Sequence, residues 1–433
     1  MLRTFVFYDI MKNRTAILLL FLANTVSGIS QGICMIAIPW YFTATLGWQS
    51  SFGIFYGILT LISTVWSIYA GTLIDKYNRK NIQIVYSFLG FLLMSLAALA
   101  GYFENIPLWV VSGVAFAFTI LLYNIHYMNI YSIAQEISPP EYYNKIISYL
   151  EVQGQATTIL GGAAAAILLE GSRNGVLSIF GFHMETFFTF VPWSLYQIYA
   201  LDAFTYFLAI LILISIRIQP SKNRIIESES AWIRIKTGWN FLRDKPALII
   251  VGWLSPAVFV CVLLISFFLM PSYVSQVLGA SSNVFASSEL YFALGALLAG
   301  FLARHFLQSR HEVSRILILF AMTLVVFAVF IFNRSLGIFY AANILFGFSN
   351  ASIRFNRVSY FWKLVPNHLM GRVSSVLNIS SYLLRALWGF VFSLPIFTGR
   401  EGIVAVMWIL FFFILLSGIV IFKYSKDIKS LEN

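Results

Sequence analysis

The chain has 433 residues, of which 60% are hydrophobic and 10% are charged. A soluble protein of this length needs far more polar surface, so a soluble globular fold is excluded. The formal net charge of +11 does not call for a nucleic-acid partner, because basic residues between membrane spans and their contact with anionic lipid explain it.

Apolar stretches divide the chain into predicted membrane spans, each close to or above the ~20 residues that a helix needs to cross a bilayer. They number twelve and lie near residues 15–41, 50–71, 82–103, 107–133, 145–169, 196–216, 247–274, 284–304, 314–333, 336–360, 372–397 and 402–423. The first is too long and too polar for a cleaved signal peptide, so we expect it to remain in the mature protein. The fold class is therefore predicted to be an all-α membrane protein.

The first span carries Asn24, Ser27 and Gln31 at helical spacing. Polar residues are costly in lipid, so this stripe is expected to face the interior of a helix bundle.

The segment at residues 71–80 joins the second and third spans. It contains a glycine, an acid and two basic residues at its end, namely Gly71, Asp75, Arg79 and Lys80. Gly71 would allow two helices to approach closely, and Asp75 would sit against a helix N-terminus. The two basic residues would face cytoplasmic water.

Polar stripes recur in the fourth and fifth spans. Their members are Asn124, Tyr127, Tyr131 and Gln135 in the fourth span, and Ser148, Glu151, Gln155, Thr158 and Gly162 in the fifth. A low-dielectric site favours a protonated carboxyl group, so Glu151 is the first candidate for proton coupling. Alternatively, Glu151 pairs permanently with an arginine or a hydroxyl and only holds helices together. His126 is either a proton relay or a satisfied hydrogen-bonding residue, and we favour the second interpretation.

Asp202 and Glu289, in the outer parts of the sixth and eighth spans, are second candidates for proton coupling. Helix packing or an outer gate is an alternative role for Asp202. The aromatic-rich stretch at residues 171–194 is expected to lie on the outer interface as a lid. Within the polar linker at residues 219–245, residues 230–242 are expected to form an amphipathic helix on the membrane surface, with Trp232 and Trp239 on one face.

Arginines occur inside the tenth and eleventh spans. The polar stripes there consist of Asn343, Gly347, Asn350, Arg354 and Arg357 in the tenth span, and Asn378, Ser381, Tyr382 and Arg385 in the eleventh. An arginine near a span end usually snorkels to the interface, which fits Arg357 as well as a cavity does. Arg354 and Arg385 lie deeper and are expected to face a central cavity.

Basic residues between the spans fall almost entirely on one side of the bilayer if both termini are cytoplasmic. Only Arg173, Arg334 and Arg400 then lie on the opposite side. Positive residues are retained in the cytoplasm, so both termini are predicted to be cytoplasmic. The histidines show no metal-ligand spacing and the cysteines lie in apolar runs, so no metal site or cofactor is expected. The lack of a P-loop sequence argues against nucleotide-driven pumping.

Short internal matches link the two halves of the chain. Residues 137–148 align with residues 364–375 at an offset of 227, and residues 12–17 align with residues 243–248 at an offset of 231. Each match places one helix over the helix six positions later, as parallel six-helix repeats would. We therefore predict two pseudo-symmetric six-helix bundles, at residues 1–218 and 246–433, joined by a cytoplasmic linker at residues 219–245.

Residues 71–80 resemble the signature between the second and third helices of major facilitator superfamily transporters. With the span count and the repeats, this resemblance covers the whole chain. Within the superfamily the sequence is similar to the macrolide-efflux and enterobactin-exporter branch, through residues 75–80, 136–141, 238–246, 365–367 and 371–375. The resemblance implies two bundles that rock about a central cavity. We also expect a cytoplasmic gate at residues 71–80, because the matching residues 300–307 keep a glycine and a basic residue but no acid. In this expectation Asp75 is held near Gly371 and Arg372 in the outward-open state.

These observations predict a secondary transporter and not an enzyme, because the isolated acids supply no catalytic cluster. The expected solute is a small amphipathic anion, siderophore-like or drug-like, with binding residues Asn24, Gln31, Asn124, Tyr127, Gln155, Asn350, Arg354, Tyr382 and Arg385. Proton-coupled export is expected. Import of an anionic solute is the alternative, because Gly162 stands where antiporters of the superfamily carry a proline. We expect a monomer in the bacterial cytoplasmic membrane, with lipid, solute and a proton as its partners.

Overall fold

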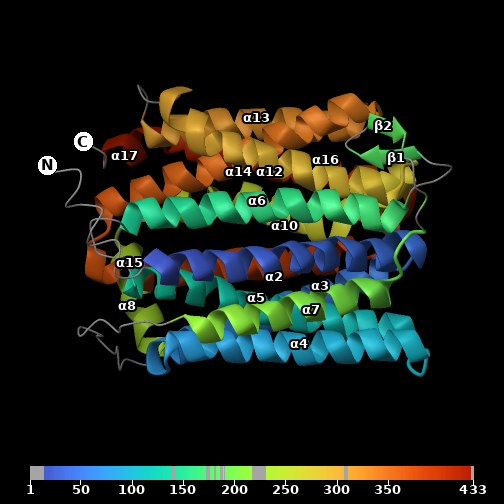
Figure 1. The fold of residues 1–433 in the computed structure, drawn as a ribbon. Helices are drawn as coiled ribbons and strands as arrows, with labels where there is room; N and C mark the ends of the chain where they lie inside the picture. The colour runs from blue at the N-terminus through green and yellow to red at the C-terminus, as the bar shows by residue number, and fades with distance from the viewer. Residues whose placement is uncertain are drawn as a thin grey trace, which may run out of the picture. The chain divides into compact units, whose positions relative to one another are not determined.

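The computed structural model describes residues 14–137, 143–171, 176–179, 182–185, 189, 191–216, 231–306 and 311–430. In this part of the chain 12 helical segments are long and apolar enough to cross a membrane, which confirms the predicted all-α membrane fold (Figure 1). The helices up to the central linker are α2 (Arg14–Trp40), η1 (Tyr41–Thr45), α3 (Gln49–Lys76), α4 (Arg79–Phe103), α5 (Leu108–Glu136), α6 (Tyr143–Glu170) and α7 (Leu195–Ser215).

The remaining helices begin in the linker and run to the C-terminal end. They are α8 (Ala231–Arg243), α9 (Pro246–Leu254), α10 (Ala257–Leu264), η3 (Ile265–Leu269), α11 (Met270–Ser272), η4 (Tyr273–Val277), α12 (Ser282–Phe306), α13 (Glu312–Phe332), α14 (Leu336–Leu364), α15 (Asn367–Phe392), η5 (Pro395–Phe397), α16 (Gly399–Lys423) and α17 (Ser425–Ser430). The predicted amphipathic helix of the linker is thus present as α8.

Contacts group the chain into two compact units, each described here by itself. The first takes in residues 1–38, 65–177 and 185–228, and the second takes in residues 39–64, 178–184 and 229–433. The second unit therefore includes the end of α2 and the first half of α3, as well as the C-terminal helices. The division into two six-helix bundles at residues 218 and 246 stays a prediction.

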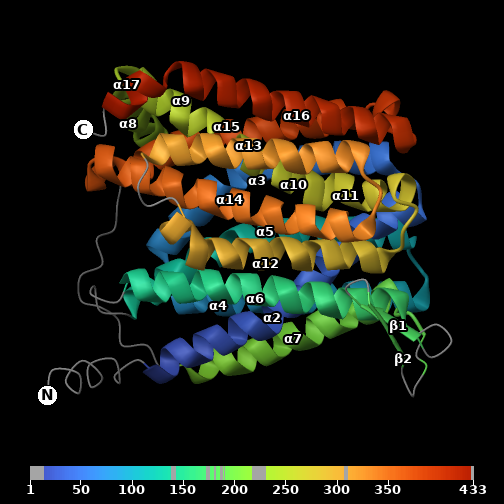
Figure 2. The ribbon, with the colours of Figure 1, turned by 90° about the horizontal axis from the view of Figure 1, so that it is seen from above.

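In the first unit α4 lies beside α7 and also packs on α5 (Figure 1). A buried apolar cluster joins α2, α5, α6 and α7, and it includes Leu20, Ile133, Leu150 and Leu213. These residues recur at helical spacing on each element, so the apolar face of each helix is the face that packs. In the second unit α14 lies between α12 and α13, and α16 packs beside α13 (Figure 2).

The seventh span is not one regular helix. It is a series of α9, α10, η3, α11 and η4, in which η3 and η4 are π-helical. Pro256 and Pro271 lie within this series. Proline lacks a backbone N–H and its ring clashes with the carbonyl four residues earlier. For Pro271 that carbonyl belongs to Phe267 in the wider π-helical turn η3, and Pro256 stands at the break between α9 and α10.

A local repeat at the ends of the first and seventh spans was not among the sequence matches. Pro39 and Pro271 each stand two residues before a π-helical turn, η1 in the first span and η4 in the seventh. Each turn is followed by a glycine with positive φ, +70° at Gly47 and +62° at Gly279. The closing hydrogen bonds also correspond: Leu46 N to Tyr41 O at 2.9 Å, and Leu278 N to Tyr273 O at 3.1 Å. The two spans therefore end with the same arrangement of a proline, a π-helical turn and a glycine with positive φ, which supports an internal duplication.

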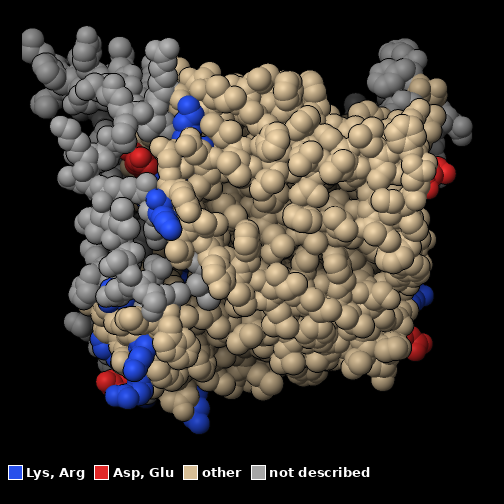
Figure 3. Space-filling model, turned by 90° about the horizontal axis from the view of Figure 1, so that it is seen from below, with Lys and Arg blue, Asp and Glu red and all other residues tan. Residues whose placement is uncertain are grey.

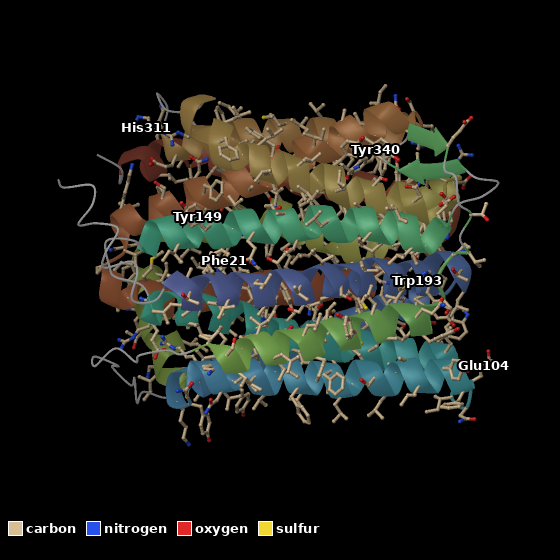
Figure 4. All side chains as sticks on the ribbon, in the orientation of Figure 1. Phe21, Glu104, Tyr149, Trp193, His311 and Tyr340 are labelled. Carbon is tan, nitrogen blue, oxygen red and sulfur yellow. The ribbon has the colours of Figure 1, made fainter. Side chains whose placement is uncertain are left out.

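The segment between α6 and α7 contains strands that the sequence did not predict. β1 (Val176–Ile179) and β2 (Phe182–Glu185) pair in a two-stranded sheet. The following residues return to α6, where the Trp193 backbone N–H donates to the Leu168 carbonyl oxygen at 2.8 Å. Trp193 is labelled in Figure 4. The expected lid function of residues 171–194 stays a prediction.

Charge is distributed as a membrane protein requires. On the face shown in Figure 3 the broad middle is formed by uncharged side chains, and the described Lys, Arg, Asp and Glu side chains lie along its margins. Large exposed apolar side chains such as Leu18, Val65 and Leu96 cover the spans. An apolar surface of this extent is stable in lipid and would aggregate in water.

Candidate functional site

Five side chains from four helices of the first unit form one hydrogen-bonded network, here named the amide–histidine network: Asn24, Gln83, His126, Asn129 and Gln153. The Asn129 amide donates to Gln83 Oε1 at 3.1 Å, and Gln83 Nε2 lies 2.7 Å from His126 Nδ1. His126 Nε2 lies 2.7 Å from Asn24 Oδ1. The Asn24 amide then donates to Gln153 Oε1 at 3.1 Å. The network thus connects α5, α4, α2 and α6.

Both ring nitrogens of His126 are used within this network. Asn24 Oδ1 can only accept, so Nε2 carries the hydrogen and Nδ1 accepts from the Gln83 amide. The far end is also satisfied, because Gln153 Nε2 donates to the Phe21 carbonyl oxygen (Phe21 is labelled in Figure 4). His126 is therefore a satisfied hydrogen-bonding residue, the interpretation favoured by the sequence.

A small hollow adjoins the network, and it has essentially no volume that a water-sized molecule could occupy. Its lining comes from α2, α4, α5 and α7: Leu20, Ala23, Asn24, Ser27, Gln83, Ser87, His126, Ile130, Ala209 and Leu213. Sites for drug-sized ligands usually enclose ≈ 300–1,000 Å³. The hollow is therefore too small for the expected amphipathic solute in this conformation.

Asp202 occupies a second buried place in the same unit. It has no exposed surface, and Cys34 Sγ lies 3.6 Å from its Oδ2. Its Oδ1 is buried and has no hydrogen-bond partner among the described residues. Nearby, the Gln31 amide lies 3.5 and 3.4 Å from the Tyr86 and Tyr206 hydroxyls. Gln31, a predicted solute-binding residue, is thus buried among tyrosines.

Glu151 lies on α6 and faces α5. The Tyr131 hydroxyl donates to Glu151 Oε1 at 3.0 Å. The Tyr131 ring contacts the tilted ring of Tyr127, with centroids 4.9 Å apart, and the Tyr127 centroid lies 6.0 Å from that of Tyr123. This tyrosine ladder runs along α5, with Tyr123 and Tyr127 about two-fifths exposed. Glu151 has the hydroxyl partner that its structural interpretation requires, and its coupling role stays a prediction.

Two further predicted binding residues lie in the first unit. Asn124 is half-buried on α5, and its Nδ2 is a buried donor with no hydrogen-bond partner among the described residues. Gln155 is half-buried on α6, one turn beyond Glu151. Asn124 therefore has a donor available for a ligand, unlike Asn24, whose amide is already used.

The basic residues of the 71–80 segment bind protein groups. Arg79 Nη1 donates to the Ser132 carbonyl oxygen at 2.8 Å and lies 3.4 Å from Glu136 Oε2, so it ties α4 to the end of α5. Lys80 Nζ lies 3.1 and 2.6 Å from the carbonyl oxygens of Ile214 and Ile216, where it caps the C-terminal end of α7. Both side chains are partly exposed as well as bound to protein groups, so their expected contact with cytoplasmic water stays a prediction.

The other residues of the predicted gate make fewer contacts that support a gate. A Cβ added at Gly71 would meet no atom within 4 Å, so the expected close helix approach at this glycine is absent from this conformation. The side chain of Asp75 lies outside the described residues. Gly371 likewise has open space around it. The Arg372 carbonyl oxygen lies against Gly238 of α8. The latch between Asp75 and this end of α15 stays a prediction.

Arg385 on α15 lies between two tyrosines of the second unit. Its guanidinium carbon is 5.9 Å from the centroid of the Tyr56 ring and 5.1 Å from that of Tyr382. The Tyr56 hydroxyl donates to the Leu263 carbonyl oxygen at 3.2 Å, which fixes its ring against α10. Arg385 Nε is buried and has no hydrogen-bond acceptor among the described residues. The sequence predicted Tyr382 and Arg385 as neighbours but missed Tyr56.

The tenth span, α14, contains two more arginines on one face. Arg354 and Arg357 are close enough to repel each other, and Arg354 lies over the Phe355 ring at 5.6 Å. Asn350, one turn earlier, is half-buried. The rest of the predicted stripe has another role: a Cβ on Gly347 would clash with the Phe292 carbonyl of α12, so that part of the helix face packs against a neighbour.

Glu289 and Glu312 are acids of the second unit that lie within or next to its spans. Glu289 was predicted, and Glu312 belongs to an ion pair that the sequence did not predict. Glu289 on α12 hydrogen-bonds the Ser266 hydroxyl of η3. Glu312, at the start of α13, forms an ion pair with Lys363 and also accepts from the Ser359 hydroxyl at 3.4 Å. No cluster of three or more His, Cys, Asp or Glu that could hold a metal ion occurs in the part of the chain that the structure describes.

Solved structures to which this chain is similar include several transporters. The chain is similar to a bacterial homologue of the iron transporter ferroportin in an inward-facing state, with a TM-score of 0.66, 16% identity, and coverage of 94% of this chain and 98% of that one. A mutant of the nucleoside transporter NupG gives a TM-score of 0.70 at 13% identity, with coverage of 94% and 99%. A D-xylose–proton symporter gives 0.65 at 14% identity, with coverage of 95% and 97%.

The sequence comparisons agree with the fold. No curated protein sequence matches the chain. The profile of the Major Facilitator Superfamily matches residues 20–389, which is most of the chain and includes both the amide–histidine network and Arg385. The superfamily profile, the twelve spans and the transporter neighbours point to a transporter and not to an enzyme. The chain belongs to the Major Facilitator Superfamily.

Proposed function

We propose that this protein is a secondary active transporter that moves a small amphipathic organic anion across the bacterial cytoplasmic membrane by alternating access. The anion is siderophore-like or drug-like, and the transport is coupled to protons and directed outward. Membership of the macrolide-efflux and enterobactin-exporter branch is part of this proposal. The protein acts as a monomer with both termini in the cytoplasm.

The main support for an anionic substrate is that arginines lie within membrane spans of the second unit. Among the residues that the structure describes, no salt bridge joins Arg357 or Arg385 to an acid. Arg385 stacks between tyrosines with its Nε unused, so charge and a donor remain for a ligand. Cations inside a membrane are costly without a partner, and a carboxylate or phenolate would compensate them.

Aromatic residues near the polar groups support the amphipathic character of the solute. Tyr382 and Phe355 lie beside the arginines, and the tyrosine ladder of α5 presents neighbouring rings next to Glu151. Ligand sites usually combine such apolar surface with a few placed polar groups. A solute with aromatic rings and acidic oxygens fits these side chains better than a simple sugar.

Asp202 supports proton coupling alongside Glu151 and Glu289. It is fully buried, and its described contacts include a thiol but no cation. An isolated carboxylate is expensive in such surroundings, so binding a proton stabilises it. Release of that proton would require a cation or water to approach Asp202 during the transport cycle. We therefore favour Asp202 among the three candidates for proton coupling.

Anion recognition can be tested with the full-length protein in detergent by measuring the binding of a tricatecholate siderophore and of a cationic dye. Arg385→Ala should weaken siderophore binding by roughly ten- to hundred-fold, because a charged hydrogen bond contributes about 1.5–3 kcal/mol. Arg385→Lys should restore part of the affinity. Arg400→Ala, which removes an exposed arginine at the start of α16, is the matched control. Equal affinities in wild type and Arg385→Ala would contradict the assignment.

Coupling and direction can be tested in proteoliposomes. An imposed pH gradient should drive siderophore flux in the wild type and not in Asp202→Asn, whereas counterflow exchange without a gradient should persist in this variant. Cys34→Ser, which replaces the thiol beside the carboxyl group by a hydroxyl, is the control and should remain coupled. Solute accumulation in inside-out vesicles at an acidic interior supports export. Accumulation only in right-side-out vesicles supports the alternative, import.

A further inference from the structure

Helix α8 is not part of any span, yet it is fixed to the second unit. Its Gly238 lies directly against the Arg372 carbonyl oxygen of α15, and a Cβ there would clash with that backbone. Leu242, one turn later on the same side, has no exposed surface. One face of α8 therefore packs on α15 and holds the helix in a defined orientation.

A neighbouring face of α8 carries a stripe of four side chains, Trp232, Lys236, Trp239 and Arg243. They are spaced by four, three and four residues, so they line up along the helix. Trp232 is 73% exposed and Trp239 is 39% exposed. Lys236 is exposed, and Arg243 contacts only the neighbouring, equally exposed Asp244, at 3.3 Å, among the ion pairs that the structure describes. We name this set the α8 stripe.

The α8 stripe continues onto a surface that faces lipid. Trp239 stacks on Trp253 with ring centroids 6.1 Å apart and an angle of 16° between the rings. Trp253 belongs to the span Pro246–Val277 and is 41% exposed, so its outer surface meets the bilayer. The tryptophans therefore extend from the apolar part of the membrane to the polar end of the span.

We propose that the α8 stripe binds the headgroups of anionic phospholipids at the membrane surface. Tryptophan prefers the level of the headgroups, because its ring is apolar and its N–H is polar. The alternating Lys236 and Arg243 place two positive charges at the same level, where phosphate oxygens accept from them. A soluble protein partner would not explain why Trp239 stacks on Trp253, whose outer surface faces lipid.

Lipid bound at the α8 stripe would affect α15, because α8 contacts both the lipid and α15. A headgroup bound to α8 would stabilise the contact between the packed face of α8, which includes Gly238, and the residues at the start of α15. Helix α15 also carries Arg385. Anionic lipid is therefore expected to stabilise the second unit, a result that does not depend on which solute is transported.

The proposal can be tested with a fluorophore on Asn240→Cys, an exposed position next to the stripe, in the full-length protein in lipid nanodiscs. The native cysteines are buried and should not react. Spin-labelled phosphatidylglycerol should quench the fluorophore at roughly thirty-fold lower mole fraction than spin-labelled phosphatidylcholine. The double variant Lys236→Gln/Arg243→Gln should remove this preference, a loss of roughly thirty-fold in relative affinity for two surface charges.

Lys423→Gln/Lys426→Gln, which removes two exposed charges from α16 and α17, is the matched control and should keep the preference. Phosphatidylglycerol should also raise the melting temperature of the wild type more than that of the double variant in α8. Equal quenching by both lipids in the wild type would overturn the proposal. So would an unchanged preference in the α8 variant, or self-quenching between two labelled copies in place of quenching by lipid, which would indicate a dimer contact.

Discussion

At the scale of single residues, the polar side chains inside the spans divide into satisfied and unsatisfied groups. Most polar atoms of the amide–histidine network are paired within it or with the backbone, and Asn129 Oδ1 is its one atom that is buried without a hydrogen-bond partner among the described residues. By contrast, Asn124 Nδ2, Asp202 Oδ1 and Arg385 Nε are buried without a hydrogen-bond partner among the described residues. Because satisfied groups stabilise helix packing and unsatisfied groups can bind a ligand or a proton, the network is structural and the second set is the better source of site residues.

The network predicts a specific loss of stability when His126 is removed. In His126→Leu, Gln83 Nε2 and Asn24 Oδ1 lose their partners, and each unsatisfied buried group costs about 1–3 kcal/mol. We expect a clearly lower midpoint in SDS titration or thermal unfolding. The control is Phe118→Leu on the same helix, at a side chain 43% exposed, which should change the midpoint little.

A double variant separates the network from simple loss of packing volume. If the two side chains act through their 2.7 Å contact, Gln83→Leu combined with His126→Leu should cost less than the sum of the single changes, because the two apolar residues no longer leave each other unsatisfied. Strict additivity would mean that the histidine acts by packing alone.

At the scale of helices, local features of the sequence predicted local structure well. The spans and the linker helix α8 followed from runs of apolar residues and from helical spacing, which depend only on neighbours along the chain. The stripe in α14 was interpreted less well, because Gly347 faces α12 and not a cavity. The rotation of a helix about its own axis depends on its neighbours in space, so spacing alone could not assign that face.

The same limit applies to the site. Asn24 was recognised as polar, but its partners Gln153 and His126 lie 129 and 102 residues away, and their meeting is set by helix crossings. Arg79 and Lys80 were expected to face water, and their additional contacts with the ends of α5 and α7 were not predicted. The repeat of Pro39 and Pro271, each eight residues before a glycine, was present in the sequence and could have been found by extending the offset of 231 by one residue.

The repeated turn predicts that Gly47 and Gly279 are required for stability, whereas a helical glycine with open space around it is not. Both have positive φ, where an L-residue costs roughly 1–2 kcal/mol. Gly47→Ala and Gly279→Ala should each lower the unfolding midpoint. Gly300→Ala is the control, because its helix position has open space, and alanine should be neutral or stabilising there. Similar midpoints for all three variants would argue against a shared strained turn.

At the scale of the whole molecule, alternating access requires helix contacts that form in one state and separate in another. A contact of this kind occurs within the second unit, where the first half of α3 crosses α15 through glycines. A Cβ added at Gly389 would lie 3.3 Å from the Gly57 Cα, and one added at Gly57 would lie 3.0 Å from the Phe390 ring. Tyr56 brings Arg385 to the same crossing. The proposed anion-binding arginine therefore lies where two moving helices would meet.

The crossing has no space for a larger side chain, so Gly389→Val should favour the conformation in which α3 and α15 separate. Overpacking costs about 1–3 kcal/mol in the packed state, which shifts the ratio of the two conformations by roughly 5- to 150-fold. Ser393 is 4% exposed and lies beside Gly53 at this crossing. A single cysteine there, with Cys34 and Cys261 replaced by alanine, should react faster with a membrane-impermeant maleimide in the Gly389→Val background. Gly418→Val on α16 is the control, since a Cβ at that glycine makes only ordinary contact, 3.5 Å from Phe320. Unchanged labelling in a variant that keeps its melting temperature would show that this crossing does not open during transport.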